Sequence, residues 1–251
     1  MNSVRYFSFM QNEKGLSGEN PFPVCGITCL SCGSMKPARD NGNRERVFRR
    51  LGLPPESVLA LNQTHSRIVH VADSPSVLSC FSEGDGMISR NRDLVLSVSV
   101  ADCMPVYIFD PVSGCFGVLH SGWRGTGIIR SAFELAFDEW GADPSGFHVL
   151  FGPHIRSCCY TVDAERAEYF ARTFGPSCVS LDTERESRLD NWPYRLSLAE
   201  ANRLLCVSLG VKENHIVDTN ECTSCNGEFG SCRREGPGKF TNMAAFIHRI
   251  D

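Results

Sequence analysis

The stretch LVLSVSVADCMPVYIFDPVSGCFGVLH, residues 94–120, carries three strand-like runs in succession. Residues 94–100 alternate between valine or leucine and serine, residues 106–109 are apolar, and residues 115–120 form another apolar run, which suits a buried strand. The segment Ala101–Pro105, with a charged residue and a proline, interrupts the pattern between the first two runs. We therefore predict three strands here, with loops between them.

Helical patterns follow this stretch. The glycine-rich turn Gly122–Gly127 leads into residues 128–140, whose apolar positions recur at helical spacing. Asp163 is an N-cap candidate for a helix over 163–173, and Ser197 with Glu200 forms a capping box for a helix over 197–209. We also predict a short helix at 47–53 and short strands at 67–72, 147–151, 215–217 and 243–247. The elements do not alternate as βαβ units, so an α+β fold is favoured over a doubly wound parallel sheet.

Length and charge exclude several classes of protein. The chain has 251 residues, with 25 Lys plus Arg against 29 Asp plus Glu, a net charge of −4. This length allows one or two domains. A mildly acidic net charge does not indicate a protein that binds nucleic acid, since such proteins carry an excess of Lys and Arg. No apolar run approaches the roughly 18 residues of a membrane span, and the N-terminus has no apolar secretory core. We expect a cytoplasmic protein that binds neither nucleic acid nor membrane.

Thirteen cysteines are the most unusual feature of the composition. An odd count without an export signal favours a reducing compartment. The spacing of Cys25, Cys29 and Cys32 would suit an iron–sulfur cluster, and Cys222-x2-Cys225 with Cys232 could complete a structural zinc or cluster site. Because the two groups lie far apart in the sequence, we favour free thiols for both.

His65, Cys103 and His120 each stand where a predicted strand meets a loop. Two imidazoles and one thiolate are a ligand set that zinc accepts, with a fourth position left for a water whose pKa falls to roughly 7. On spacing alone, a buried cysteine with two hydrogen-bonded histidines is the simpler interpretation. A third interpretation makes Cys103 a nucleophile and His120 its base, with Asp102 or Asn62 as the orienting group.

The turn Gly122–Gly127 is a candidate anion site. Free N–H groups at a helix N-terminus attract negative charge, and Arg124 would add a bidentate contact to phosphate or carboxylate. A simple tight turn explains the same residues equally well.

Several ordered motifs together resemble the YfiH-like family, also called the laccase-domain or multicopper polyphenol oxidoreductase family, whose members are described as purine nucleoside phosphorylases. The matching motifs run in order along the chain: Asn62–His65, Asp85-Gly86, Ala101–Pro105, His120–Gly125, Gly152–Ile155 with Cys158-Cys159-Tyr160, Ala201–Arg203, Cys222–Cys225 and Arg233-Arg234.

The resemblance implies one catalytic domain over residues 1–251, built from two packed mixed β-sheets flanked by helices in α/β/β/α layers. It implies a zinc site at His65, Cys103 and His120, with copper as the alternative metal. The implied activity is phosphorolysis of adenosine, inosine and 5′-methylthioadenosine, together with deamination of adenosine. The partners would be a purine nucleoside and phosphate, and we expect a monomer or a homodimer.

On this interpretation Cys103, Asp102 and Arg124 are the catalytic residues. Asp102 would transfer a proton, Arg124 would hold phosphate, and Gln63, Arg124 and Arg233 would bind substrate. Three alternatives remain open. One is a cysteine hydrolase, such as an amidase of peptidoglycan precursors, and another is a binding protein without activity. The third is copper-dependent phenol oxidation, which ranks last among enzymes because a multicopper site needs many histidines and the chain has seven.

Overall fold

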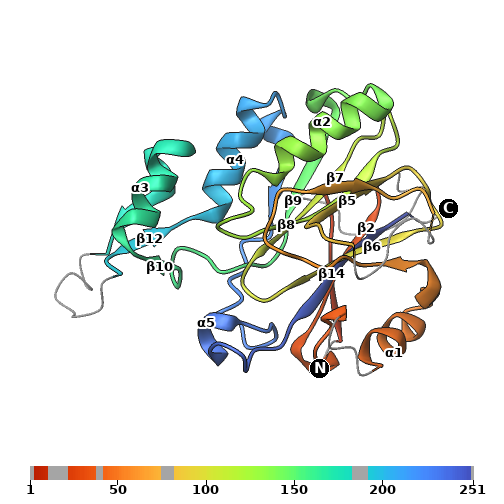
Figure 1. Cartoon of the computed structure of the whole chain (residues 1–251), viewed down its shortest axis with the longest axis horizontal. Coiled ribbons are helices and arrows are strands. Elements are labelled where there is room, and N and C mark those ends of the chain that lie inside the picture. Colours follow the sequence, from red (N-terminus) through yellow and green to blue (C-terminus); the bar gives the residue numbers. More distant parts are fainter. Residues whose placement is uncertain (1–2, 11–21, 38–41, 75–81, 183–191, 250–251) are drawn as a thin grey trace.

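Two mixed β-sheets pack face to face, and helices cover both outer faces (Figure 1). The computed structural model describes residues 3–10, 22–37, 42–74, 82–182 and 192–249. The predicted α+β class, with two packed sheets flanked by helices, is confirmed.

The first sheet has five strands in the order β1-β2-β14-β6-β3. Only the pair β3 and β6 is parallel. The bounds are β1 (Val4–Phe7), β2 (Val24–Thr28), β14 (Met243–His248), β6 (Val95–Val100) and β3 (Val58–Leu59).

The second sheet has six strands in the order β13-β9-β7-β8-β5-β4. The bounds are β13 (Ile216–Asp218), β9 (His148–Phe151), β7 (Met104–Phe109), β8 (Phe116–Ser121), β5 (Gly86–Ser89) and β4 (Val69–Val71). The outer pairs β13/β9 and β5/β4 are parallel, and the others are antiparallel. As a result β4, β5 and β7 all begin at the end of the sheet where β8 finishes.

The main core lies between the two sheets and explains the alternation in residues 94–100. Leu96 and Val98 of β6 pack against Tyr107 and other residues of the second sheet. Ser97 points to the outer face, where its hydroxyl donates to the Leu59 carbonyl at 2.7 Å and accepts from Arg44 at 2.6 Å. Both faces of β6 are buried, and the inner face packs against the second sheet, so its polar side chains need such partners.

Helices α2 (Ile128–Trp140) and α4 (Leu198–Ser208) lie over the outer face of the second sheet, and α1 (Asn43–Arg50) lies over the first (Figure 1). The bounds of α2 are those predicted. The side chain of Ser197 accepts from the Glu200 N–H and caps α4, as the capping box requires. Helix α1 begins four residues before the predicted range.

A third, smaller unit stands beside the two large sheets, on the left of Figure 1. Its three strands are β10 (Thr161–Val162), β12 (Tyr194–Leu196) and β11 (Val179–Leu181), and α3 (Ala164–Thr173) packs on them. Asp163 caps α3 through the Arg166 N–H, as predicted. Short helices with both ends among the described residues are α5 (Cys232–Glu235) and the 3₁₀ turns Leu30–Cys32, Pro55–Ser57, Pro144–Gly146, Pro176–Cys178 and Glu213–His215.

The N-terminal cysteines are not gathered into a cluster. Cys25 lies in β2 and faces the core between the sheets, whereas Cys32 packs on the outer face of the first sheet. Both are buried free thiols, as is Cys29, which agrees with the favoured interpretation of this group.

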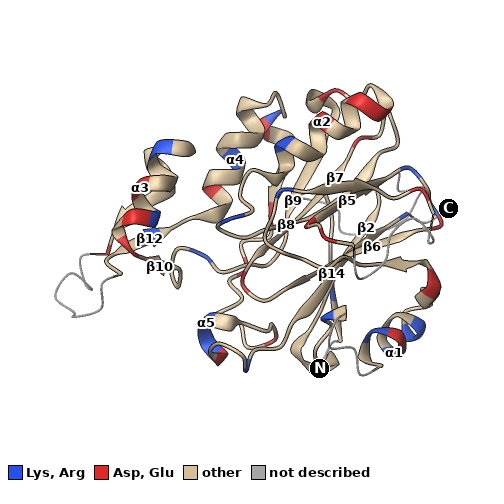
Figure 2. Ribbon diagram, viewed as in Figure 1, with Lys and Arg blue, Asp and Glu red and all other residues tan. Residues whose placement is uncertain are grey.

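Charged residues of both signs lie mainly on helices and loops, while the central strands carry few of them (Figure 2). Among the described residues, no helix has the length and apolar character needed to cross a membrane.

Candidate functional site

Four chain segments bring polar side chains to one end of the six-stranded sheet. His65 lies in the loop before β4, Asp85 immediately precedes β5, and Cys103 immediately precedes β7. His120 lies near the end of β8, which runs in the opposite direction. Because β4, β5 and β7 begin where β8 ends, the four side chains meet there.

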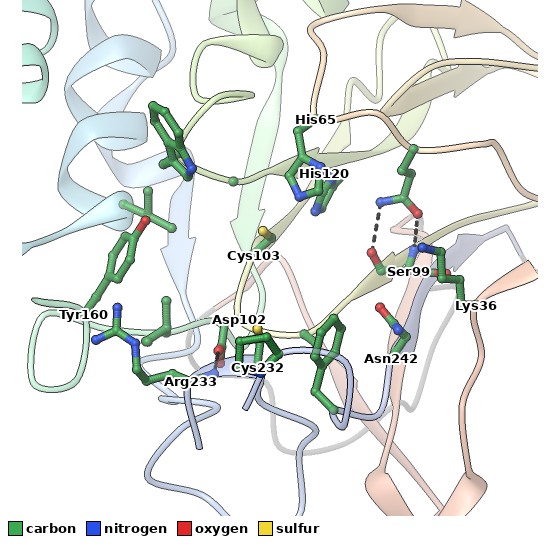
Figure 3. A pocket seen from close by; sticks show the side chains of 18 of the residues that line it. Lys36, His65, Ser99, Asp102, Cys103, His120, Tyr160, Cys232, Arg233 and Asn242 are labelled. Atoms are coloured by element: carbon green, nitrogen blue, oxygen red, sulfur yellow. Dashed lines mark hydrogen bonds between the residues drawn. The ribbon is translucent and has the colours of Figure 1, made fainter. Parts of the chain in front are cut away.

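The donor atoms of His65, Cys103 and His120 all lie within 4.8 Å of one another. The two imidazole rings meet edge to face with their centroids 4.9 Å apart, and the Cys103 sulfur lies below them in Figure 3. His120 is buried, Cys103 is half-buried and His65 is exposed, so one side of the group faces outward. This arrangement fits a His₂Cys zinc site with one open position.

Asp85 is fully buried behind His120. One carboxylate oxygen accepts a hydrogen bond from His120 Nδ1 at 2.8 Å, and the other accepts from the Ser66 N–H and hydroxyl at 2.7 Å each. Burial alone would raise the pKa of Asp85, but the hydrogen bonds from His120 and Ser66 outweigh it and lower the pKa to about 2. The carboxylate keeps the proton on Nδ1, which leaves Nε2 as the metal-binding atom.

Cys103 and His120 shift each other's protonation. Burial raises the pKa of Cys103, but His120 and His65 outweigh burial and lower it to about 6. Burial lowers the pKa of His120, but Cys103 and Asp85 outweigh it and raise the pKa to about 9. Without a metal, the two groups therefore form a thiolate–imidazolium pair at neutral pH.

Gly122 makes room for the Cys103 sulfur. A Cβ atom at this position would lie 2.7 Å from Sγ, closer than van der Waals contact allows. The first glycine of the glycine-rich turn is thus required by the thiol beside it.

The three donors line a cavity of about 490 Å³ (Figure 3). Aromatic side chains and two cations complete much of its wall: Trp123, Tyr160, Trp192, Phe240, Lys36 and Arg233. A volume of this size with flat aromatic surfaces suits a small ligand with a planar ring, and the cations suit an anionic group.

Asp102 lines the cavity beside Cys103, but both of its carboxylate oxygens have protein partners. Oδ1 accepts from the Thr223 hydroxyl at 2.6 Å, and Oδ2 accepts from the Arg233 N–H at 2.7 Å. Its φ is +84°, and that of His65 is +60°. Left-handed backbone at non-glycine residues is costly and concentrates at functional sites, where the surroundings enforce it.

Gln63 also lines the cavity, and its amide bonds to the backbone of Ser99. Nε2 donates to the Ser99 carbonyl at 2.9 Å, and Oε1 accepts from the Ser99 N–H at 2.6 Å. The side chain therefore ties the loop that carries His65 to β6, and both ends of its amide are already engaged.

Arg124, which we predict to hold phosphate, does not line this cavity. It is exposed, its guanidinium stacks 4.9 Å from the centre of the Trp123 ring, and it lines a separate hollow of about 340 Å³. The guanidinium of Arg67 lies over Gly127 at the start of α2, so a cation already faces the predicted anion site.

Arg233, which we predict to bind substrate, lines the cavity. Its Nη1 donates to the Cys159 carbonyl and the Thr161 hydroxyl, and its Nη2 donates to the Thr161 carbonyl, at 2.8, 2.9 and 3.0 Å. Three of the five N–H groups of the guanidinium are thus used to fix it, and two are left for a ligand.

Asp85 was not among the predicted site residues, and Cys232 does not join Cys222 and Cys225, as one alternative had it. Asp85 belongs to a motif of the resemblance, but its bond to His120 depends on the pairing of β5 with β8, which spacing does not reveal. Cys232 lines the cavity, and the sulfurs that meet Cys222 and Cys225 belong to two other cysteines, Cys158 and Cys159.

Comparisons with known proteins agree with this fold. A family model described as multi-copper polyphenol oxidoreductase laccase matches residues 29–250. Purine nucleoside phosphorylase YlmD of Geobacillus stearothermophilus is 33% identical over 216 residues, which cover 82% of this chain and 77% of that protein. A purine nucleoside phosphorylase of Deinococcus radiodurans is 33% identical over 232 residues, covering 92% and 85%. The crystal structure of the Geobacillus YlmD superposes with a TM-score of 0.80 at 29% identity, covering 97% of this chain and 99% of the other. The chain therefore belongs to the multi-copper polyphenol oxidoreductase laccase family.

Proposed function

We propose that the protein is a zinc-dependent purine nucleoside phosphorylase that acts on adenosine, inosine and 5′-methylthioadenosine and also deaminates adenosine. The observation that carries the proposal is the meeting of His65, Cys103 and His120 in the wall of an aromatic cavity. Two relatives that are 33% identical to this chain over the aligned residues carry the name purine nucleoside phosphorylase.

The donor set fits a zinc ion. His65, Cys103 and His120 would hold it, since Asp85 fixes the proton of His120 on Nδ1 and the Cys103 pKa is already lowered to about 6. Bound there, zinc supplies a Lewis acid and lowers the pKa of a bound water, which is the chemistry that deamination needs. Copper is the alternative occupant, since imidazole and thiolate ligands bind it as well.

For phosphorolysis the chain must hold a planar base and a phosphate close together. Tyr160 and Trp192 offer flat surfaces for a base, and the Arg233 guanidinium lies 5.6 and 5.2 Å from the centres of these rings. Its two remaining N–H groups point to Arg233 as the phosphate-binding cation, in preference to Arg124. Holding phosphate next to the ribose positions it to attack the anomeric carbon as the glycosidic bond breaks.

Asp102 is the candidate for proton transfer because it adjoins Cys103 in the cavity wall. Each carboxylate oxygen keeps a lone pair after its bond to Thr223 or Arg233, so it still accepts a proton. The same bonds make Asp102 a positioning residue for the backbone of Arg233.

Incubation of the zinc-loaded protein with adenosine and phosphate tests this function. Adenine with ribose 1-phosphate means phosphorolysis, and inosine means deamination. Cys103→Ala should abolish both products together with zinc at this site. Cys115→Ala, which removes a buried thiol at the opposite end of β8, should retain them. Absence of both products in the unmodified protein, or full turnover by Cys103→Ala, would overturn the proposal.

A cysteine hydrolase is the second candidate, and the thiolate–imidazolium pair of Cys103 and His120 favours it. Zinc removal separates the two candidates. Loss of activity on chelation supports the metal, whereas an active metal-free protein that iodoacetamide inactivates supports the nucleophile.

A further inference from the structure

Cys158, Cys159, Cys222 and Cys225 form a second group of metal-ligating side chains. All four sulfur atoms lie within 4.8 Å of one another. Cys158 and Cys159 stand in the turn between β9 and β10, and Cys222 and Cys225 stand in the turn after β13. We propose that these four thiols bind a structural zinc ion, separate from the site at Cys103.

The distances between the sulfurs match a single tetrahedral ion. Four thiolates at about 2.3 Å from zinc lie about 3.8 Å from one another, by the geometry of a tetrahedron. The Cys158 sulfur lies 3.9 Å from that of Cys159 and 3.7 Å from that of Cys225, and the Cys159 and Cys225 sulfurs are 3.3 Å apart. In a [4Fe–4S] cluster each cysteine binds a different iron, which separates the sulfurs further than this group allows.

The fold brings the two turns together independently of any metal. Strands β9 and β13 are parallel neighbours, so both turns leave the same end of the sheet. His154 and Cys222 form a β-bridge, and Arg156 makes an ion pair with Asp218 at 2.8 Å. The Arg156 N–H also donates to the Cys222 sulfur at 3.5 Å, an interaction that stabilises a thiolate.

The surrounding charges suit a negatively charged centre. Four thiolates with one zinc ion carry a net charge of −2. Arg195 donates to the Cys158 carbonyl at 2.9 Å, and Arg233 donates to the Cys159 carbonyl at 2.8 Å. Arg234 donates to two carbonyls of the other cysteine turn at 2.7 and 3.3 Å. Three guanidinium groups therefore lie against the backbone of the two turns. Arg195 also pairs with Asp182 at 3.0 Å and Arg234 with Glu235 at 3.1 Å, so Arg233 contributes most to offsetting the negative charge.

The role of this site would be structural. Four protein ligands leave no open position for a substrate, which is typical of zinc ions that stabilise a fold. The adjoining residues reach the cavity, because Thr223 bonds to Asp102 and Arg233 bonds to the Cys159 carbonyl. The zinc would therefore fix the turns that hold this wall of the cavity.

Zinc content and X-ray absorption at the zinc edge test the proposal. The double variant His65→Ala, Cys103→Ala removes two of the three donors of the first site and leaves the four-cysteine group intact. We expect it to retain about one zinc per chain, with a shell of sulfur alone at about 2.3 Å. Nitrogen or oxygen in that shell, copper in place of zinc in the purified protein, or no metal at all would overturn the proposal.

A matched pair of single variants tests the same ligands. Cys225→Ser should lose one zinc per chain relative to the unmodified protein. Cys232→Ser changes a nearby thiol outside the group and should lose none. Equal zinc content in both variants, or a disulfide among the four cysteines in the mass of the purified protein, would contradict a zinc site. If Cys225→Ser does not fold, the absorption spectrum of the double variant still decides the question.

Discussion

Replacing Asp85 by asparagine tests the claim that this carboxylate prepares His120 to bind a metal. The oxygen that accepts from Ser66 and Thr64 has three donors, whereas the other accepts from His120 Nδ1 and the His65 N–H. The amide oxygen will therefore keep the three-donor position, and the NH₂ group will face His120. An NH₂ donor turned toward Nδ1 forces the proton onto Nε2, the atom that a metal needs.

The substitution should weaken metal binding and lower the free energy of unfolding. Losing the partner that orients a metal-binding histidine costs about 10–100-fold in metal affinity, which is about 1.4–2.8 kcal/mol. Two hydrogen bonds to a charged acceptor are also lost, at about 1.5–3 kcal/mol each, so the free energy of unfolding should fall by about 3–6 kcal/mol. The pKa of Asp85 is depressed to about 2, so its stabilisation is fully present above the unfolded value of 3.8. It is lost as the pH falls through about 2. The stability gap between the two proteins should therefore be full at pH 7 and shrink in acid.

Zinc competition with a chromogenic chelator measures the affinity, and denaturant unfolding at pH 7 and pH 3 measures the stability. Asp110→Asn is the matched control, because Asp110 is also a buried carboxylate that accepts from backbone N–H groups, at the opposite end of β7. It should lose stability and keep its zinc. If the Asp85 variant holds zinc as tightly as the Asp110 variant, the carboxylate only supports the fold.

Three further changes probe the cavity. Arg233→Lys should raise the KM for phosphate at least tenfold, because it removes the fixed guanidinium, whereas Arg124→Lys should change this KM by no more than about twofold. Equal effects of the two substitutions would indicate that Arg124 also binds phosphate. In metal-free protein, the rate at which iodoacetamide alkylates Cys103 should reach half its maximum near pH 6, as measured by peptide mass spectrometry. A midpoint near the ordinary pKa of a thiol would refute the lowered pKa. Gly122→Ala should lower the zinc content, because the new methyl group would lie 2.7 Å from the Cys103 sulfur. Full zinc content in this variant would show that the turn shifts to make room for the methyl group.

The parts of the fold that local sequence encodes were predictable. The bounds of α2 follow from its apolar spacing, and the caps Asp163 and Ser197 mark the starts of α3 and α4. The three central strands also appear where the valine-rich and apolar runs stand. Strand β2 was missed, because Gly26 within it and the proline-rich residues just before it are typical of a loop.

Site residues could be predicted from the sequence where they stand at the end of a recognisable strand, but not where they depend on how strands pair. His65, Cys103 and His120 each adjoin a strand end, and the resemblance supplied the connection between them. The partnership of Asp85 with His120 depends on strand pairing, and the meeting of Cys158 with Cys225 depends on the parallel contact of β9 and β13. Spacing does not show which way the Arg124 side chain points, and in the structure it stacks over Trp123 and lines a separate hollow.

The order of the strands has a consequence for how the protein is made. His65, Asp85, Cys103 and His120 all come from the stretch 65–120, whereas the cavity wall also needs residue 36 and residues between 155 and 242. Shorter loops cost less entropy to close, so the candidate metal site needs only residues 65–120, while the cavity awaits the last strand, β14. During synthesis, all of the residues that would bind this metal have emerged before the second half of the chain. We expect a metal bound at that stage to favour the pairing of β4, β5, β7 and β8 ahead of the rest of the fold.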